Sequence, residues 1–289
     1  SWGNDKHRDQ WLSTLETHVF PMIGDLRVDQ IGTPEMLKAL KGIWLTKPET
    51  ARRVRQRIRT VLDWAKTAGF RSGDNPADGV ARGLPAQPRR DGHFKALPYS
   101  EVADFIQKLR DSDAGEVVKL AFEFAILTAC RTQEVLGAQW SEIDLDKAVW
   151  IIPATRMKGD REHRVPLPPR AIELLQAARK MSKSENVFPG RDGEQPLSNM
   201  ALLMAVRRLA VDTTVHGFRS SFRDWSAEQT NFPREVCEMA LAHSIGSAVE
   251  AAYRRGDLFE KRRKLMTAWS NYVVAPSSGK VLPMRRIGG

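Results

Sequence analysis

The sequence predicts a mostly α-helical protein of two domains, the second of which contains a small antiparallel β-sheet. Apolar residues recur at helical spacing over most of the 289 residues, and three short strand-like runs interrupt this pattern near the middle. A stretch rich in Pro, Gly and Arg, residues 84–98, has no periodicity and is typical of a linker. We therefore expect a helical domain over 1–88, a linker over 89–98, an α+β domain over 99–275 and a flexible tail over 276–289.

In the first domain, the spacing predicts helices over Asp9–Val19, Pro34–Leu45 and Glu49–Lys66. The third of these has an apolar face, and its other faces carry five arginines: Arg52, Arg53, Arg55, Arg57 and Arg59. The planar guanidinium group suits phosphate oxygens, and few acidic residues lie between the five. We predict that this helix contacts a DNA backbone; a charged face that only meets solvent is the alternative.

The second domain begins with helical patterns and continues with short strands. The predicted helices are Ser100–Arg110, Glu116–Thr128, one from Pro168, Asn199–Ala210, Gly217–Glu228, Pro233–Ala242 and Ala248–Arg255. The predicted strands are Ile143–Leu145, Val149–Ile152 and Arg164–Leu167. Ser247 and Glu250 form a capping-box pattern at the start of the last helix.

Composition and charge narrow the class of protein. A net charge of +10 and a pI near 9.8 favour a polyanionic partner such as nucleic acid over a basic surface without one. Cys130 and Cys237 lie in apolar helical runs, which indicates reduced, buried thiols in an intracellular protein. No Cys/His zinc spacing, bilayer-spanning stretch or signal peptide is recognised. Because the chain begins with Ser1, we expect it to be an excised piece of a longer protein.

Several polar residues are not explained by helical periodicity. They are Arg131, Lys158 in a hairpin tip, His216 and Arg219 at a spacing of three, His243 and Tyr253. Each alone has an ordinary structural explanation, such as an ion pair, a solvated turn or a packed ring. Together they can attack a phosphodiester without a metal: arginines neutralise the oxygens, tyrosine supplies a nucleophile, and histidine and lysine move protons.

These residues occur in four motifs that resemble the tyrosine recombinase family, specifically integrases of the satellite-phage and genomic-island type. The motifs are ACRTQEVLGAQW, MKGDREHRVPL, HGFRSSFRDW and LAHSIGSAVEAAYRRGD, in family order. The resemblance covers residues 95–274 by motif, and the first domain more loosely resembles the family's helical core-binding domain. It implies that an N-terminal arm-binding domain is missing here. Ala242 replaces the glycine that many relatives have before the second histidine.

The resemblance implies a role for each residue. Tyr253 would form a 3′-phosphotyrosine bond, and Arg131 and Arg219 would stabilise the pentacoordinate phosphorus. Lys158 would protonate the leaving oxygen, and His216 would serve as acid and base for the tyrosine. His243 would hydrogen-bond a phosphate oxygen, with Glu134 in support of the first arginine.

The same resemblance implies a site-specific recombinase that integrates or excises a mobile element. It would act on double-stranded attachment sites as a synaptic tetramer, with possible accessory DNA-bending or directionality proteins. It would need no cofactor, no metal and no membrane, and would work in the bacterial cytoplasm at the nucleoid. Two alternatives stay open: a type IB topoisomerase-like relaxing enzyme, which shares the catalytic set, and a catalytically inactive DNA-binding regulator.

Overall fold

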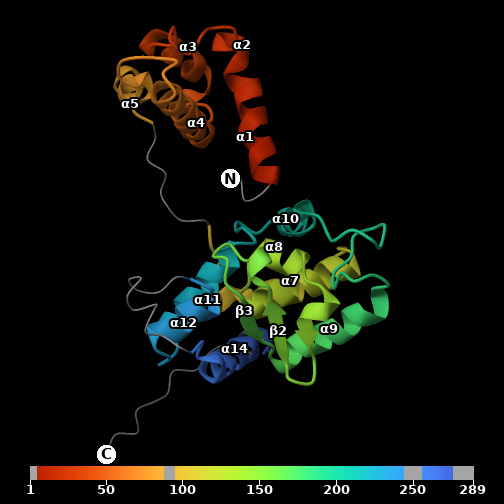
Figure 1. Cartoon of the computed structure of the whole chain (residues 1–289). Coiled ribbons are helices and arrows are strands. Elements are labelled where there is room, and N and C mark those ends of the chain that lie inside the picture. Colours follow the sequence, from red (N-terminus) through yellow and green to blue (C-terminus); the bar gives the residue numbers. More distant parts are fainter. Residues whose placement is uncertain (1–4, 88–94, 244–255, 276–289) are drawn as a thin grey trace, which may run out of the picture. The chain divides into compact units, whose positions relative to one another are not determined.

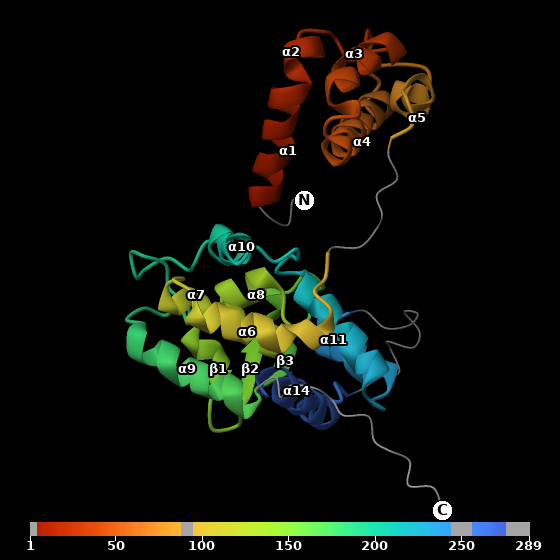
Figure 2. The ribbon, with the colours of Figure 1, turned by 180° about the vertical axis from the view of Figure 1, so that it is seen from behind.

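The computed structural model describes residues 5–87, 95–243 and 256–275. The chain divides into two compact units, residues 1–92 and 93–289, and the boundary falls inside the predicted linker. The predicted fold class is confirmed: the described part is mostly helical, with one three-stranded antiparallel sheet (Figures 1 and 2). No helix in these ranges is long and apolar enough to cross a bilayer.

The first unit is a small helical domain. Its elements are α1 (Asp5–His18), α2 (Phe20–Ile23), α3 (Thr33–Trp44), α4 (Pro48–Thr67), α5 (Pro76–Gly79) and the 3-10 turn η1 (Val80–Gly83). The three predicted helices are present as α1, α3 and α4. Apolar side chains of α3 and α4, such as Met36, Leu40, Val54 and Leu62, form the centre of its core.

Arg57 corrects the prediction that all five arginines of α4 face outward. This side chain is 6% exposed, and its guanidinium donates to the backbone oxygens of Gln10 at 2.7 Å and Trp11 at 3.3 Å. It follows Val54 by three positions and precedes Ile58, so it lies at the edge of the apolar face. Arg57 therefore holds α1 against α4 instead of pointing to solvent.

The stretch 84–98, rich in Pro, Gly and Arg, packs on one of the units at each of its ends. At its start, Trp44 donates its indole N–H to the oxygen of Pro85 at 2.7 Å, and Gln87 donates to the oxygen of Trp44 at 2.8 Å. At its end, Leu97 is buried in the second unit's core, and the Lys95 ammonium is 2.8 Å from Asp212. Residues 84–87 thus pack on the first unit and residues 95–98 on the second.

The second unit surrounds its small sheet with helices (Figure 1). The sheet has the order β1 (Ile143–Asp144), β2 (Val149–Ile152), β3 (His163–Pro166), with Ile152 opposite His163. The strands lie within one residue of their predicted ends. The helices are α6 (Val102–Asp111), α7 (Glu116–Thr128), α8 (Thr132–Leu136), α9 (Pro169–Met181), α10 (Asn199–Arg208), α11 (Gly217–Glu228), α12 (Arg234–Ala240) and α14 (Phe259–Val274).

Among the described helices of the second unit, α8 and α14 were not predicted. Helix α14 packs against α7, α12 and β3, and its Trp269 donates to the oxygen of Ile126 at 2.8 Å. Its many charged residues weaken the apolar periodicity, although Leu265, Met266 and Trp269 are fully buried. The predicted helix Ala248–Arg255 and the tail 276–289 lie outside the described residues.

The start of α11 is placed by a close approach of two backbone segments. A Cβ on Gly217 would lie 2.3 Å from the oxygen of Lys95, so only glycine fits there. The hydroxyl of Ser221, one turn later, donates to the oxygen of Leu97. Segment 95–98 is therefore fastened to α11, and this contact orients the helix that carries Arg219.

Candidate active site

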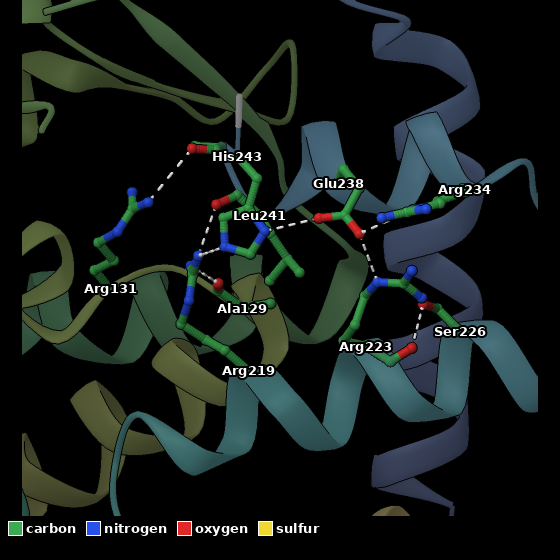
Figure 3. Close-up of polar contacts among 10 residues, drawn as sticks. Ala129, Arg131, Arg219, Arg223, Ser226, Arg234, Glu238, Leu241 and His243 are labelled. Carbon is green, nitrogen blue, oxygen red and sulfur yellow. Dashed lines mark hydrogen bonds and ion pairs between the residues drawn. The ribbon is translucent and has the colours of Figure 1, made fainter. Parts of the chain in front are cut away.

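Three of the predicted site residues meet in the second unit: Arg131, Arg219 and His243 (Figure 3). Arg131 comes from the turn between α7 and α8, Arg219 from α11, and His243 from the residues just after α12. Residues more than a hundred positions apart in the chain are thus brought to one place by the packing of three helices.

Arg131 is oriented by the carboxylate of Glu134. Helix α7 ends at Ala129 in the left-handed conformation, with φ 50°, and Arg131 then begins α8 as its N-cap residue. Glu134 accepts from the Arg131 backbone N–H at 2.7 Å and from its guanidinium at 2.8 Å. The Glu134 side chain is 4% exposed and that of Arg131 is 25% exposed. One side of the guanidinium therefore stays accessible to an anion while the other is held.

Arg219 is buried and already donates to backbone oxygens. Its guanidinium donates to the oxygen of Ala129 and, at 2.6 Å, to the oxygen of Leu241, while its Nε has no hydrogen-bond partner among the described residues. Burial lowers the pKa of Arg219 from its ordinary value, yet arginine stays protonated at any physiological pH. The result is a fixed, largely desolvated positive charge with donors left over.

His243 bridges this arginine and an acidic residue. Its Nε2 lies 3.2 Å from an Arg219 nitrogen, and its Nδ1 lies 2.8 Å from Glu238 Oε2. The side chain is 44% exposed, so the ring is fixed at both nitrogens while one face remains open.

His216 lies just before α11, and its pKa is affected by the charges of Arg219 and Arg131. Burial lowers the pKa of His216 below 6.5, and the positive charges of Arg219 and Arg131 lower it further. The imidazole is therefore neutral at pH 7 and can accept a proton. The positive charges of Arg131 and Arg219, with His216 and His243 beside them, form a cationic centre in which a phosphate oxygen could be bound.

The structure does not join Lys158 to this centre. Lys158 is exposed in the turn between the 3-10 turn η4 (Ala154–Arg156) and β3, and no described hydrogen bond or ion pair connects it to either arginine. Tyr253 lies outside the described residues. The roles of both residues stay predictions.

The two other tyrosines are poorly suited to act as nucleophiles. The Tyr99 hydroxyl donates to Glu228 at 2.8 Å, and this hydrogen bond raises the pKa of Tyr99 above 10. Burial raises the pKa of Tyr272, whose ring lies 6.2 Å from that of Tyr99. A raised pKa opposes formation of the phenolate that attacks phosphorus.

The sequence patterns missed two links between β3 and this centre. His163, at the start of β3, is 9% exposed and hydrogen-bonds the backbone of Ala240 at the end of α12. Burial lowers the pKa of His163 to about 3, helped by the charges of Arg262 and Arg219. This neutral ring therefore connects the hairpin that carries Lys158 to the segment that carries His243. In the sequence, the one signal for His163 is its position shortly after the MKG turn.

The second link fastens the chain just after the undescribed residues 244–255. Arg262 of α14 is 1% exposed and donates to Asp257 Oδ2 at 2.6 Å and to the oxygen of Arg164 in β3 at 2.5 Å. Arg164 in turn lies over the Phe259 ring, 4.1 Å from its centroid. The segment that follows Tyr253 by four residues is thus tied to the strand that follows Lys158.

Neither a reactive thiol nor a metal site is found in the described part of this region. Burial raises the pKa of Cys130 to about 12, so this thiol stays protonated although Arg131 is adjacent. In the described ranges, no three His, Cys, Asp or Glu side chains are grouped so that they could hold a metal ion.

Comparison with known proteins decides the family. The model of the phage integrase family matches residues 95–258, and that of the phage integrase central domain matches residues 1–81. The chain belongs to the phage integrase family. In this integrase-family chain, the central-domain match ends before the boundary between the two compact units and the other match begins just after it.

Curated relatives extend the match over nearly the whole chain. The integrase of Enterobacteria phage P4 is 31% identical over 94% of this chain, and the prophage integrase IntA of Escherichia coli K12 is 30% identical over 95%. The chain spans 66% of the length of each of these two proteins. It spans 69% of the prophage integrase IntZ of the same strain, which is 32% identical.

Solved structures share the fold at low sequence identity. A lambda integrase dimer bound to a COC′ core site has a TM-score of 0.66 with 18% identity, and covers 84% of this chain and 89% of its own. The Tn1549 transposon integrase in complex with circular intermediate DNA has a TM-score of 0.61 with 13% identity, over 86% and 92%. These likenesses establish the architecture of this family member.

Proposed function

We propose that this integrase-family chain is a site-specific DNA recombinase that cleaves and rejoins duplex DNA through a 3′-phosphotyrosine bond. The observation that carries the proposal is the meeting of Arg131, Arg219 and His243. A cationic centre of this kind matches the charge that develops on the oxygens of a phosphodiester under attack.

Each step of the proposed reaction uses a named residue. The Tyr253 hydroxyl attacks phosphorus and gives its proton to His216, while Arg131 and Arg219 stabilise the two non-bridging oxygens. The bond between phosphorus and the 5′ oxygen breaks, and Lys158 supplies the proton that this oxygen needs. A 5′ hydroxyl of another strand then attacks the phosphotyrosine, and the reverse proton transfers restore the enzyme.

The partners follow from the same proposal. The chain would bind double-stranded attachment sites and assemble on them as a tetramer, as lambda integrase does in its complex with a Holliday junction. Accessory DNA-bending or directionality proteins would set the choice between integration and excision. Work on chromosomal DNA would place the protein at the nucleoid in the bacterial cytoplasm.

A two-site assay tests this function. The DNA on both sides of the gene is first searched for a direct repeat; the substrate is a supercoiled plasmid that carries two copies of it, and the control plasmid lacks them. We expect recombinant products only when both repeats are present. Equal relaxation of both plasmids without recombinants would support the type IB topoisomerase-like alternative, and binding without strand breakage would support the inactive regulator.

The lowered pKa of His216 predicts the pH dependence of cleavage. His216 must be neutral to accept the tyrosine proton, and its pKa is lowered from 6.5, so the acid limb of activity should be centred below pH 6.5. Single-turnover cleavage rates measured across this range check the prediction. An acid limb centred at or above 6.5 in wild type would assign the base to another group.

Helix α4 is proposed to contribute affinity for any DNA sequence. Arg52 is paired with Glu49, and Arg59 with Asp63 and Asp78. No described ion pair involves Arg53 or Arg55, which makes these two the better candidates for phosphate contacts.

Replacing both Arg53 and Arg55 with alanine should weaken binding to all duplexes and flatten its salt dependence. Two lost phosphate contacts reduce the slope of log K against log salt by about 1.8. Binding to duplexes of unrelated sequence, measured over a range of salt, gives the slope. Arg27→Ala is the matched control, because Asp29 pairs with Arg27 at 2.9 Å. An unchanged slope in the double variant would mean that α4 only meets solvent.

A further inference from the structure

Glu238, which is not in the predicted catalytic set, connects His243 to helix α11 (Figure 3). Its Oε2 lies 2.8 Å from His243 Nδ1, and its Oε1 accepts from Arg223 Nε at 2.8 Å. Arg234, one turn earlier on α12, lies 3.7 Å from the same Oε1. The side chain is 16% exposed, so the carboxylate is largely sheltered between the two helices.

We propose that Glu238 is a positioning residue for His243, which it holds with Nδ1–H toward the carboxylate and with Nε2 toward the arginines that bind phosphate. The inference deepens the proposed function, on which its catalytic consequence rests. The structural part of the inference, the orientation and tautomer of the ring, is independent of any DNA.

The tautomer follows from the partners of the two nitrogens. Burial raises the pKa of Glu238, but the hydrogen bonds with His243 and Arg223 outweigh burial, so its pKa is below 4.5. An ionised carboxylate only accepts hydrogen bonds, so the proton of the neutral ring is on Nδ1. Nε2 then has a lone pair and accepts from Arg219 at 3.2 Å. Both observed contacts are satisfied by this tautomer and not by the other.

The lone pair on Nε2 helps to orient the guanidinium of Arg219. One Arg219 nitrogen contacts both the oxygen of Leu241 and His243 Nε2, and the other donates to the oxygen of Ala129. The ring therefore helps to fix the direction in which the remaining donors of Arg219 point. A phosphate oxygen bound between Arg131 and Arg219 would meet donors that are already in place.

The support behind Glu238 is rigid because two links join α11 to the end of α12. Arg223 reaches Glu238, and Arg219, one turn earlier on α11, reaches the oxygen of Leu241. The backbone N–H of His243 also donates to the oxygen of Glu238 at 3.0 Å. Glu238 thus contacts both the ring and the backbone of His243.

The variant Glu238→Gln gives a sharp test because an amide has only one oxygen. Arginine can only donate, so Arg223 takes that oxygen and the amide NH2 faces His243. The ring nitrogen next to it must then accept, and the ring proton moves to Nε2. The substitution therefore inverts the tautomer while keeping the size of the side chain.

The tautomer is measured by ¹⁵N NMR of the whole chain labelled in histidine, without DNA, with His243→Asn used to assign the signal among the six histidines. We expect the Nδ1–H form in wild type and in the control Asp224→Asn, which removes a neighbouring exposed carboxylate, and the Nε2–H form in Glu238→Gln. An Nε2–H form in wild type, or no change in Glu238→Gln, overturns the positioning role.

Cleavage of a nicked substrate bearing the flanking repeat tests the catalytic consequence. Glu238→Gln should slow cleavage by about 10- to 100-fold, part of the effect of losing one well-placed donor, because an Nε2–H ring no longer accepts from Arg219 and no longer orients it. In a His243→Gln background, Glu238→Gln should add almost nothing, because the two residues act as one unit. Additive losses would mean that Glu238 acts only on the fold. If the tautomer inverts as expected but wild type cuts no DNA, the proposed function fails and the positioning of His243 stands.

Discussion

The Tyr253→Phe protein should bind DNA as tightly as wild type and yet form no covalent complex with it. The substitution removes one hydroxyl, and the proposed phosphate-binding centre of Arg131, Arg219 and His243 is built from other elements. Without the attacking oxygen, no phosphotyrosine can form, so the expected loss of cleavage is complete. A nicked suicide substrate reports the covalent adduct, and a mobility shift reports binding in parallel.

The matched controls are Tyr99→Phe and Tyr272→Phe. The Tyr99 hydroxyl donates to Glu228, the Tyr272 ring lies beside that of Tyr99, and both pKa values are raised, so we expect these variants to keep forming the adduct. Adduct formation by Tyr253→Phe together with its loss in either control would move the nucleophile to that cluster.

Lys158→Ala should cut ordinary DNA at least about a hundredfold more slowly, while a substrate with sulfur at the 5′ bridging position should restore most of the rate. An alkoxide needs a proton as it leaves, and a general acid contributes about 10²- to 10⁴-fold. A thiolate leaves without a proton, so the acid is no longer needed. Lys158 is exposed in its turn and has no hydrogen bond or ion pair to the arginines among the described residues, which suits a donor that reaches the strand once DNA is bound.

Arg131→Ala is the control that separates the two roles. Arg131 is held by Glu134 and faces the non-bridging oxygens in our account, so sulfur at the bridging position should not rescue this variant. Cleavage rates of both variants on both substrates give the comparison. If Lys158→Ala is equally impaired on the sulfur substrate, Lys158 binds phosphate or supports the hairpin, and His216 becomes the next candidate for the acid.

Most helices and strands could be predicted because each depends on the apolar spacing and turn residues of its own segment. The strands β2 and β3 and the helices α6, α7 and α11 follow apolar periodicity and turn residues that each segment carries itself. Helix α14 was not predicted because its charged residues break that periodicity. One of them, Arg262, is buried, and its hydrogen bonds go to Arg164 in β3 and to Asp257.

The site was predicted in part for the same physical reason. Arg131, Arg219 and His243 stand out as polar residues in apolar surroundings, and family motifs gave them roles. Glu238 and His163 do not stand out, because their importance depends on contacts with His243 and Ala240 that only the folded chain creates. Arg57 shows the converse: an arginine in a basic run is buried because α1 offers it two carbonyl oxygens.

The most direct test of the central claim is to identify the residue that becomes linked to DNA. The covalent complex trapped on a suicide substrate is digested with a protease, and the peptide that retains a nucleotide is sequenced by mass spectrometry. The chain has three tyrosines, Tyr99, Tyr253 and Tyr272, and their peptides differ. We predict that the nucleotide is joined through its 3′ phosphate to Tyr253. Linkage to either of the other tyrosines, to a serine, or through a 5′ phosphate would contradict the account.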